Sequence, residues 1–175
     1  MNYWRCVKGF TLLEMMVSIS IIALITAIFL VNYHSTNQVT SFANALQKLS
    51  SDIRVAQNNS LGSKDFNGTV PRGGWGAHFN MASSSQYIIF ADINGNGQYD
   101  AGEEYQITNF AQNVGISSTS PAGPLLDITF RPPDPTTLFN GTSTISNAAV
   151  NIKDTVNNLS KTVEVNFLGM IDLVN

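Results

Sequence analysis

The hydrophobic and polar positions divide the chain into an apolar N-terminal run, an amphipathic stretch and a β-rich remainder. Residues 10–31 form a run of 22 residues with one charge, at Glu14. This length is sufficient for a helix to cross a bilayer core about 30 Å thick. From Val39 to Ser60 the apolar and small residues recur every three or four positions, which predicts that the helix continues to Leu61. We expect Gly62 to be its C-cap, in the left-handed conformation.

The remainder alternates between short β-type segments and turns. β-branched and aromatic residues cluster between Gly, Pro and Asn, as is typical of antiparallel strands. The serine runs 83–85 and 117–120 are interpreted as loops. The fold class predicted is α+β, with a long N-terminal helix packed on an antiparallel sheet. The predicted strands are 75–80, 86–91, 104–108, 126–131, 148–152 and 162–168.

Glu14 is the most informative single residue. A carboxylate inside a membrane-length apolar run costs about 2.5–3.5 kcal/mol on insertion scales, so we expect it to have a partner. Arg5 and Lys8 precede a break at Gly9, and Lys48 is too far along the helix to reach back. Cleavage after Gly9 would create a new α-amino cation, from the same chain or a neighbouring copy, which could pair with this carboxylate.

The sequence from Lys8 to Glu14, KGFTLLE, strongly resembles the N-terminal signal of type IV pilins and type II secretion pseudopilins. The resemblance implies cleavage after Gly9 by prepilin peptidase, N-methylation of Phe10, and a role for Glu14 in filament assembly. The alternative is an uncleaved signal anchor with a stray glutamate. Many family members carry a proline where this chain has Val31, so a kink at that position is not implied.

Later motifs narrow the resemblance to the GspH/FimT group of minor pilins and pseudopilins. They include Gly74-Trp75-Gly76, Phe90-Ala91-Asp92 and a late Val165-Asn-Phe-Leu-Gly169. A DNA-binding branch of this group has a basic motif after the final glycine, but MIDLVN follows Gly169 here, so the cations needed to bind nucleic acid are missing.

The resemblance implies a structural subunit of a type IV pilus or a type II secretion pseudopilus. The implied partners are prepilin peptidase, other pilins or pseudopilins, an assembly platform and lipid, all at the inner membrane. Arg5 and Lys8 place the N-terminus in the cytoplasm by the positive-inside rule. The predicted parts are a cleaved leader (1–9), a transmembrane or filament-core helix (10–31), its amphipathic continuation (32–62) and a β-rich periplasmic or extracellular domain (63–175). The alternatives are a major pilin and a filament-displayed binding module, such as a calcium-stabilised adhesin or a DNA-uptake receptor.

Composition agrees with an exported domain and gives no support for an enzyme. The net charge is −3 and charged residues make up 12% of the chain, so a basic nucleic-acid surface is not indicated. The single cysteine, Cys6, lies in the predicted leader, which leaves no disulfide in the mature chain. The sequence has no nucleophile with a suitably spaced base and no phosphate-binding loop. His34 and His78 are interpreted as ordinary structural histidines.

A candidate metal site lies between residues 92 and 103. Oxygen-bearing residues stand at loop positions 1, 3, 5 and 9, with glycine at 6 and glutamate at 12, which is the full pattern of a calcium loop. The flanking segments favour strands, so we do not expect a helix-loop-helix hand. The alternative is a hairpin connection in which the Asn-Gly pairs supply positive φ. The candidate calcium ligands are Asp92, Asn94, Asn96, Gln98 (through its carbonyl), Asp100 and Glu103.

Overall fold

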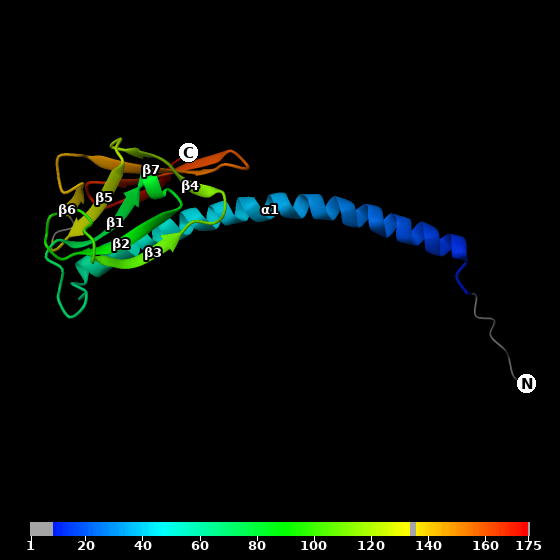
Figure 1. The fold of residues 1–175 in the computed structure, drawn as a ribbon, viewed down its shortest axis with the longest axis horizontal. Helices are drawn as coiled ribbons and strands as arrows, with labels where there is room; N and C mark the ends of the chain where they lie inside the picture. The colour runs from blue at the N-terminus through cyan, green and yellow to red at the C-terminus, as the bar shows by residue number, and fades with distance from the viewer. Residues whose placement is uncertain (1–8, 134–135, 175) are drawn as a thin grey trace, which may run out of the picture. The chain divides into compact units, whose positions relative to one another are not determined.

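One long helix and two antiparallel sheets make up the fold. The computed structural model describes residues 9–133 and 136–174, without the side chains of residues 31–38. The chain divides into two units between Thr40 and Ser41, each of which is considered by itself. Helix α1 (Leu12–Leu61) is continuous through both (Figure 1). The α+β prediction is confirmed, whereas the predicted boundaries at residues 9, 31 and 62 stay predictions.

The part of α1 within the second unit buries one stripe of side chains. These residues are spaced three or four apart, so they share one face of the helix. The predicted stripe is confirmed from Phe42 onwards, but Val39 is 46% exposed. The buried apolar members are Phe42, Leu46, Leu49, Ile53 and Ala56.

The end of α1 differs from the prediction in one detail. Lys64 N–H donates to Asn59 O at 2.9 Å and Ser63 N–H donates to Ser60 O at 3.0 Å, the bond pattern of a Schellman motif. Gly62 is therefore the C-cap, but Ser63 is the residue with positive φ, at 47°. The expectation of a left-handed Gly62 was wrong because these two bonds place the left-handed position one residue later.

In the described residues nine strands form two sheets, with orders β3-β2-β1-β5-β6 and β4-β7-β8-β9. All neighbouring strands are antiparallel. A short 3₁₀ helix, η1 (Met81–Ser83), joins β1 to β2. The strands are β1 (Gly74–Asn80), β2 (Gln86–Asp92), β3 (Glu104–Asn109), β4 (Val114–Ser120), β5 (Leu125–Arg131), β6 (Thr136–Phe139), β7 (Asn147–Asp154), β8 (Leu159–Asn166) and β9 (Ile171–Val174).

All six predicted strands exist, and three further strands were missed: β4, β6 and β9. The serine run 117–120 belongs to β4, so its interpretation as a loop was wrong. β4 lies at a sheet edge and pairs with β7, which supplies the extended conformation that the serines alone do not favour. The strand predicted over 162–168 ends at Asn166 instead, and Phe167 (53% exposed) and Leu168 (64%) lie in the β8–β9 turn.

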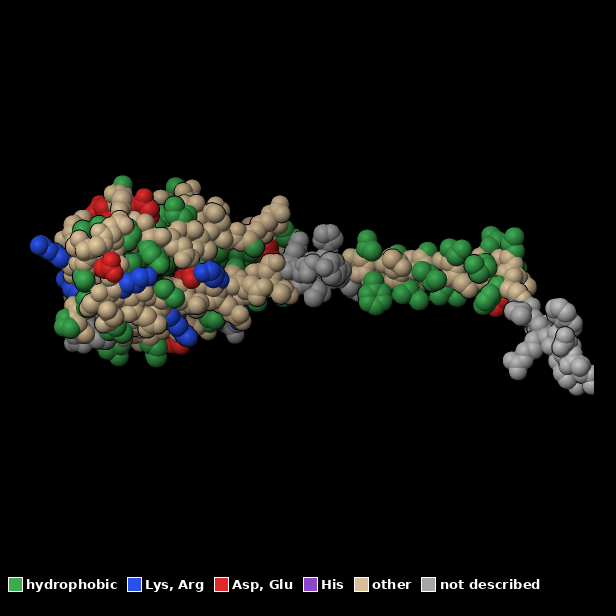
Figure 2. Space-filling model, turned by 90° about the horizontal axis from the view of Figure 1, so that it is seen from below, with side chains coloured by type: hydrophobic (Ala, Val, Ile, Leu, Met, Phe, Trp, Pro, Cys, Tyr) green, Lys and Arg blue, Asp and Glu red, His purple; other side chains and the backbone are tan. Residues whose placement is uncertain are grey.

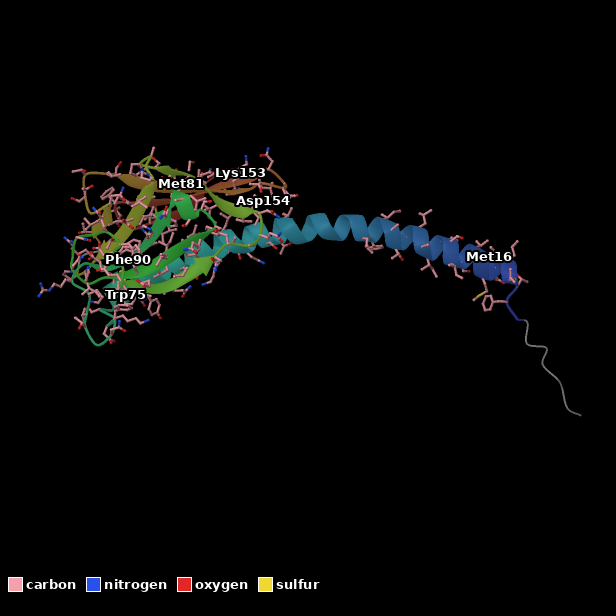
Figure 3. All side chains as sticks on the ribbon, in the orientation of Figure 1. Met16, Trp75, Met81, Phe90, Lys153 and Asp154 are labelled. Carbon is pink, nitrogen blue, oxygen red and sulfur yellow. The ribbon has the colours of Figure 1, made fainter. Side chains whose placement is uncertain are left out.

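Helix α1 and both sheets share a single hydrophobic core. From β1, Trp75, Ala77 and Phe79 enter this core, and Figure 3 labels Trp75 within the five-stranded sheet. The intervening residues of β1 point to the other face of the sheet, yet they are buried as well. Packing there is tight, since a Cβ added at Gly76 would lie 2.6 Å from Ile128 O. Strand β1 is therefore covered on both faces.

Candidate functional site

Helix α1 starts at a side-chain cap in the predicted signal region. Glu14 N–H donates to Thr11 Oγ1 at 3.2 Å, and the first helical residue is Leu12. The predicted start at Phe10 was therefore two residues too early, because Thr11 takes the N-cap position. The Thr-x-x-Glu spacing is the sequence signature of a capping box, so this role of Thr11 could have been predicted.

The first unit presents an exposed apolar helix. Residues Leu12–Leu30 have a mean hydropathy of 2.4 and none of this segment is buried, so its length and composition suit a membrane span. Figure 2 shows hydrophobic side chains distributed along it. The hydroxyls within it are satisfied by carbonyls one turn earlier: Ser18 bonds Glu14 O at 2.7 Å, Ser20 bonds Met16 O at 2.8 Å and Thr26 bonds Ile22 O at 2.7 Å.

Glu14 is thus set apart from the other polar side chains of this segment. Among the described residues its carboxylate has no hydrogen bond or ion pair, and the side chain is exposed. It lies in the first helical turn, where the helix dipole favours a negative charge. Gly9 and Phe10 precede the helix, and Phe10 is 78% exposed. Their predicted roles in cleavage and methylation stay predictions, and Lys8 lies outside the described residues.

In the second unit, residues 92–103 connect β2 to β3 through a loop closed by its own carboxylates. Asp92 is fully buried, and its two oxygens accept the N–H groups of Gly95 and Gly97, each at 2.7 Å. Glu103 is 4% exposed and accepts N–H groups from Ile93 at 2.9 Å and from Asp100 at 3.0 Å. Loop positions 1 and 12 of the predicted calcium pattern therefore already hold the loop backbone in its turns.

Three other predicted ligands converge at one point. The side-chain amides of Asn94 and Asn96 reach Asp100 Oδ2 at 2.7 and 2.8 Å. The Gln98 side chain instead donates to Asn140 O at 3.2 Å, which leaves only its backbone carbonyl for the predicted role. In the described part of the chain, no group of three or more His, Cys, Asp or Glu residues could hold a metal. The convergence therefore depends on the asparagines.

The pKa values of the adjacent residues Glu103 and Glu104 are shifted in opposite directions. Burial raises the pKa of Glu103, and the bonds from the Asp100 and Ile93 N–H groups only partly oppose this rise. The pKa of exposed Glu104 is lowered by backbone N–H groups. Glu103 is therefore the carboxylate whose ionised form is disfavoured in the closed loop.

The loop covers the face of the five-stranded sheet that points away from the shared core. The ring of Tyr99 lies 4.6 Å from that of His78 and 5.7 Å from that of Phe90, measured between ring centroids. Arg131 Nη2 donates to Gly95 O at 2.8 Å. No sequence pattern indicated that the loop covers this face, because the contacts join the loop to strands distant along the chain.

His78 and Asp127 lie beneath this loop as a buried pair. His78 Nδ1 is 2.6 Å from Asp127 Oδ1, and the two residues are 6% and 4% exposed. The interpretation of His78 as a structural histidine agrees with this contact. From the same strand as Asp127, Thr129 Oγ1 donates to Gly97 O at 3.1 Å, which fixes the loop from below.

Comparison with known protein families gives a match at the N-terminal segment. The family described as the prokaryotic N-terminal methylation motif matches residues 4–30. No curated protein and no solved structure matches the chain. The matched segment contains the capped helix start, Glu14 and most of the exposed apolar helix. The motif and the apolar N-terminal helix together support a type IV pilin-like protein, of the kind that prepilin peptidase processes.

Proposed function

We propose that this chain is a minor pilin or pseudopilin, a structural subunit of a type IV pilus or a type II secretion pseudopilus. Prepilin peptidase cleaves it between Gly9 and Phe10, and Phe10 is then N-methylated. Before assembly it spans the inner membrane once, with its N-terminus in the cytoplasm and its β-rich domain in the periplasm. The observation that carries this proposal is that the Glu14 carboxylate has no partner among the residues the structure describes, on an apolar helix whose hydroxyls bond to its own carbonyls.

The physical reason for assembly is the cost of that carboxylate away from water. An unpaired charge in hydrocarbon is unfavourable, and pairing with a cation removes much of this cost. Cleavage supplies such a cation at the amino group of Phe10. When helices of neighbouring subunits pack together, the Glu14 carboxylate of one copy pairs with the α-amino group of Phe10 in another. The partners are therefore other pilins or pseudopilins, together with the assembly platform.

The test uses two substitutions and a control in cells that assemble the filament. Replacement of Gly9 by valine should leave the unprocessed form, as seen by gel mobility. Glu14→Ala should permit cleavage but stop incorporation into sheared filaments. Ser20→Ala is the matched control, because its hydroxyl is satisfied within its own helix and its loss should leave assembly unchanged. Normal processing and assembly of both test variants would disprove the proposal.

Measurements on the same material separate the related roles. Low abundance in sheared filaments supports a minor subunit, and high abundance supports a major pilin. A gel shift with duplex DNA would support a DNA-uptake receptor instead. The methylation motif indicates a structural pilin, a class that is usually non-enzymatic.

We also propose that the 92–103 loop binds calcium, which would make the domain a calcium-stabilised module. The side chains of Asn94 and Asn96 lie beside Asp100, which supports this. Their amide nitrogens face that carboxylate and their oxygens accept the N–H groups of Asn96 and Gln98, so binding requires the amide oxygens to turn toward the ion. Each carboxylate has about four lone-pair sites, so Asp92 and Glu103 can bind an ion while they accept two N–H groups each. Calcium prefers six to eight oxygen ligands of this kind. The alternative is that the loop is only a hairpin connection, held by its own hydrogen bonds without an ion.

Calorimetric titration of the purified chain with calcium tests this second proposal. Binding heat and a higher melting temperature should appear for the wild type and disappear in Asp100→Ala. Asp65→Ala is the matched control, because Asp65 is an exposed carboxylate outside the loop. If the wild type gives neither heat nor a melting shift at millimolar calcium, the calcium proposal is wrong.

A further inference from the structure

The chain contains the same tetrapeptide, Phe-Asn-Gly-Thr, at two places, residues 66–69 and 139–142. Both copies form the same tight turn. In each, the first and fourth residues exchange two backbone hydrogen bonds, of 2.8 and 3.1 Å in one and 2.9 and 3.0 Å in the other. The central Asn and Gly have positive φ in both, as a type I′ turn requires. The two Asn-Gly bonds therefore have the same neighbouring residues and the same backbone conformation.

Their surroundings differ. Asn67 is exposed, and a Cβ added at Gly68 would have no atom within 4 Å. The two bonds that close this turn join Phe66 and Thr69, and in the described part of the chain neither Asn67 nor Gly68 makes a hydrogen bond. The ring of Phe66 packs against that of Trp75, 6.1 Å between centroids, but the Asn67-Gly68 bond itself can move without breaking a hydrogen bond to another segment.

The second turn is fixed on three sides. Asn140 N–H donates to Asp127 O at 2.9 Å, and Asp127 N–H donates to Asn140 Oδ1 at 2.8 Å. The Gln98 side chain donates to Asn140 O. A Cβ added at Gly141 would lie only 2.6 Å from Asn96 O, so this turn also packs closely against the 92–103 loop. Opening it breaks hydrogen bonds to two separate segments.

We infer that Asn67 is a site of spontaneous deamidation and that the fold protects Asn140. Asparagine is one of the thermolabile residues, and a following glycine leaves its backbone nitrogen sterically free to react. The Gly68 nitrogen loses its proton and attacks Asn67 Cγ. The N–Cγ bond forms, the Cγ–Nδ2 bond breaks, and Nδ2 leaves as ammonia. Water then opens the succinimide to aspartate or isoaspartate, which adds one negative charge to the turn.

The two Asn-Gly pairs of the 92–103 loop are protected in a different way. The attacking nitrogens would be those of Gly95 and Gly97, and both N–H groups donate to the buried carboxylate of Asp92. A nitrogen held in a charge-assisted hydrogen bond is less free to lose its proton and rotate toward the side chain. Asn67 is therefore expected to react first among the four Asn-Gly pairs.

The test is an incubation of the full chain in detergent micelles at mildly alkaline pH, followed by peptide mapping with mass spectrometry. Isoaspartate is detected by enzymatic methylation of the same peptides. Two or three additional hydrogen bonds must break at Asn140, so Asn67 should react at least about fivefold faster than Asn140. The same incubation in urea removes the fold, and the two identical tetrapeptides should then react at similar rates.

An Asn67→Gln variant is the control for assignment, because its longer side chain forms the cyclic intermediate slowly. It should lose the early product and keep the slow reaction at Asn140. Equal rates at Asn67 and Asn140 in the folded chain would overturn the inference. So would a faster reaction at Asn94, Asn96 or Asn140, or a folded chain that stays unmodified while the urea sample reacts at both tetrapeptides.

Discussion

Replacement of Asp52 by alanine should remove a buried polar cluster that fixes α1 to the five-stranded sheet. Asp52 is 6% exposed and pairs with Lys48 one turn earlier. Its other oxygen accepts the Tyr87 hydroxyl at 2.7 Å and the Gln106 amide at 3.2 Å. Burial, together with the nearby Asp52 charge, raises the pKa of Tyr87 well above its ordinary value, so the phenol stays protonated and donates. Helix and sheet thus meet through one carboxylate.

The expected loss in the free energy of unfolding is about 2–4 kcal/mol. The buried Tyr87 hydroxyl would lose its acceptor, and an unsatisfied buried donor costs about 1–3 kcal/mol. Loss of the Gln106 bond adds about 0.5–1.5 kcal/mol or more, since its acceptor is charged. The Lys48 side chain is 54% exposed, so its pairing adds at most about 1 kcal/mol. Relief from desolvation of the carboxylate offsets part of this sum.

Urea denaturation followed by tryptophan fluorescence measures this loss. Trp75 is 1% exposed and is the only tryptophan after the predicted leader, so its emission reports on the core of the β-rich domain. Tyr87→Phe should cost less than Asp52→Ala, because the carboxylate keeps its other partners. Asp65→Ala is the matched control at an exposed aspartate and should stay within about 0.5 kcal/mol of wild type. A loss below about 1 kcal/mol for Asp52→Ala would refute the reasoning.

Three further predictions concern the helix cap, one glycine and one aspartate. Thr11→Val should weaken the first turn of α1 by about 0.5–2 kcal/mol, measured by amide hydrogen exchange in micelles, whereas Thr11→Ser should retain the cap; equal exchange in both would contradict the cap. Gly76→Ala should destabilise the domain by about 1–3 kcal/mol, because the new Cβ meets a backbone oxygen at 2.6 Å, while Gly123→Ala, whose Cβ makes an ordinary 3.5 Å contact, should be near neutral in the same urea assay. The Asn157 side chain and two backbone N–H groups lower the pKa of Asp154, labelled in Figure 3, so its contribution to stability is present above its ordinary pKa and lost as the pH falls through the lowered value. Asp154→Asn should therefore flatten the acid side of the stability profile, and an unchanged profile would contradict this.

The long helix could be predicted because its signals are local. Its apolar run is continuous along the chain and its stripe of buried residues follows the helical period, and α1 contains both. The left-handed residue at its end could not be predicted from glycine preference alone. Ser63 takes that conformation because hydrogen bonds to Asn59 and Ser60 determine where the helix closes.

The missed strands show what local patterns lack. β4, β6 and β9 are outer strands of their sheets, and partners elsewhere in the chain supply their extended conformation. The serines of β4 and the exposed residues of β9 give no clean alternation. Phe167 was expected within the strand predicted over 162–168, but the β8–β9 turn begins before it.

The candidate sites could be predicted in part. The signal around Gly9, Phe10 and Glu14 is contiguous in sequence, so its residues were apparent without a structure. The calcium binding predicted for the 92–103 loop stays a prediction, and its pattern did not indicate the backbone N–H groups that Asp92 and Glu103 accept. The loop depends on contacts with β5, which no spacing rule within the loop can contain.

The cover over β1 restricts how this domain can vary in length. An ordinary hairpin connection tolerates insertions because it contacts no other element. Residues 93–103 instead pack on the face of the five-stranded sheet that points away from the core. An epitope or tag placed there would expose the Tyr99 ring and the apolar face beneath it. The turn at 66–69, which has few ties to the domain, is the better place for such an insertion. Natural relatives should accordingly differ in length around that turn more often than within residues 93–103.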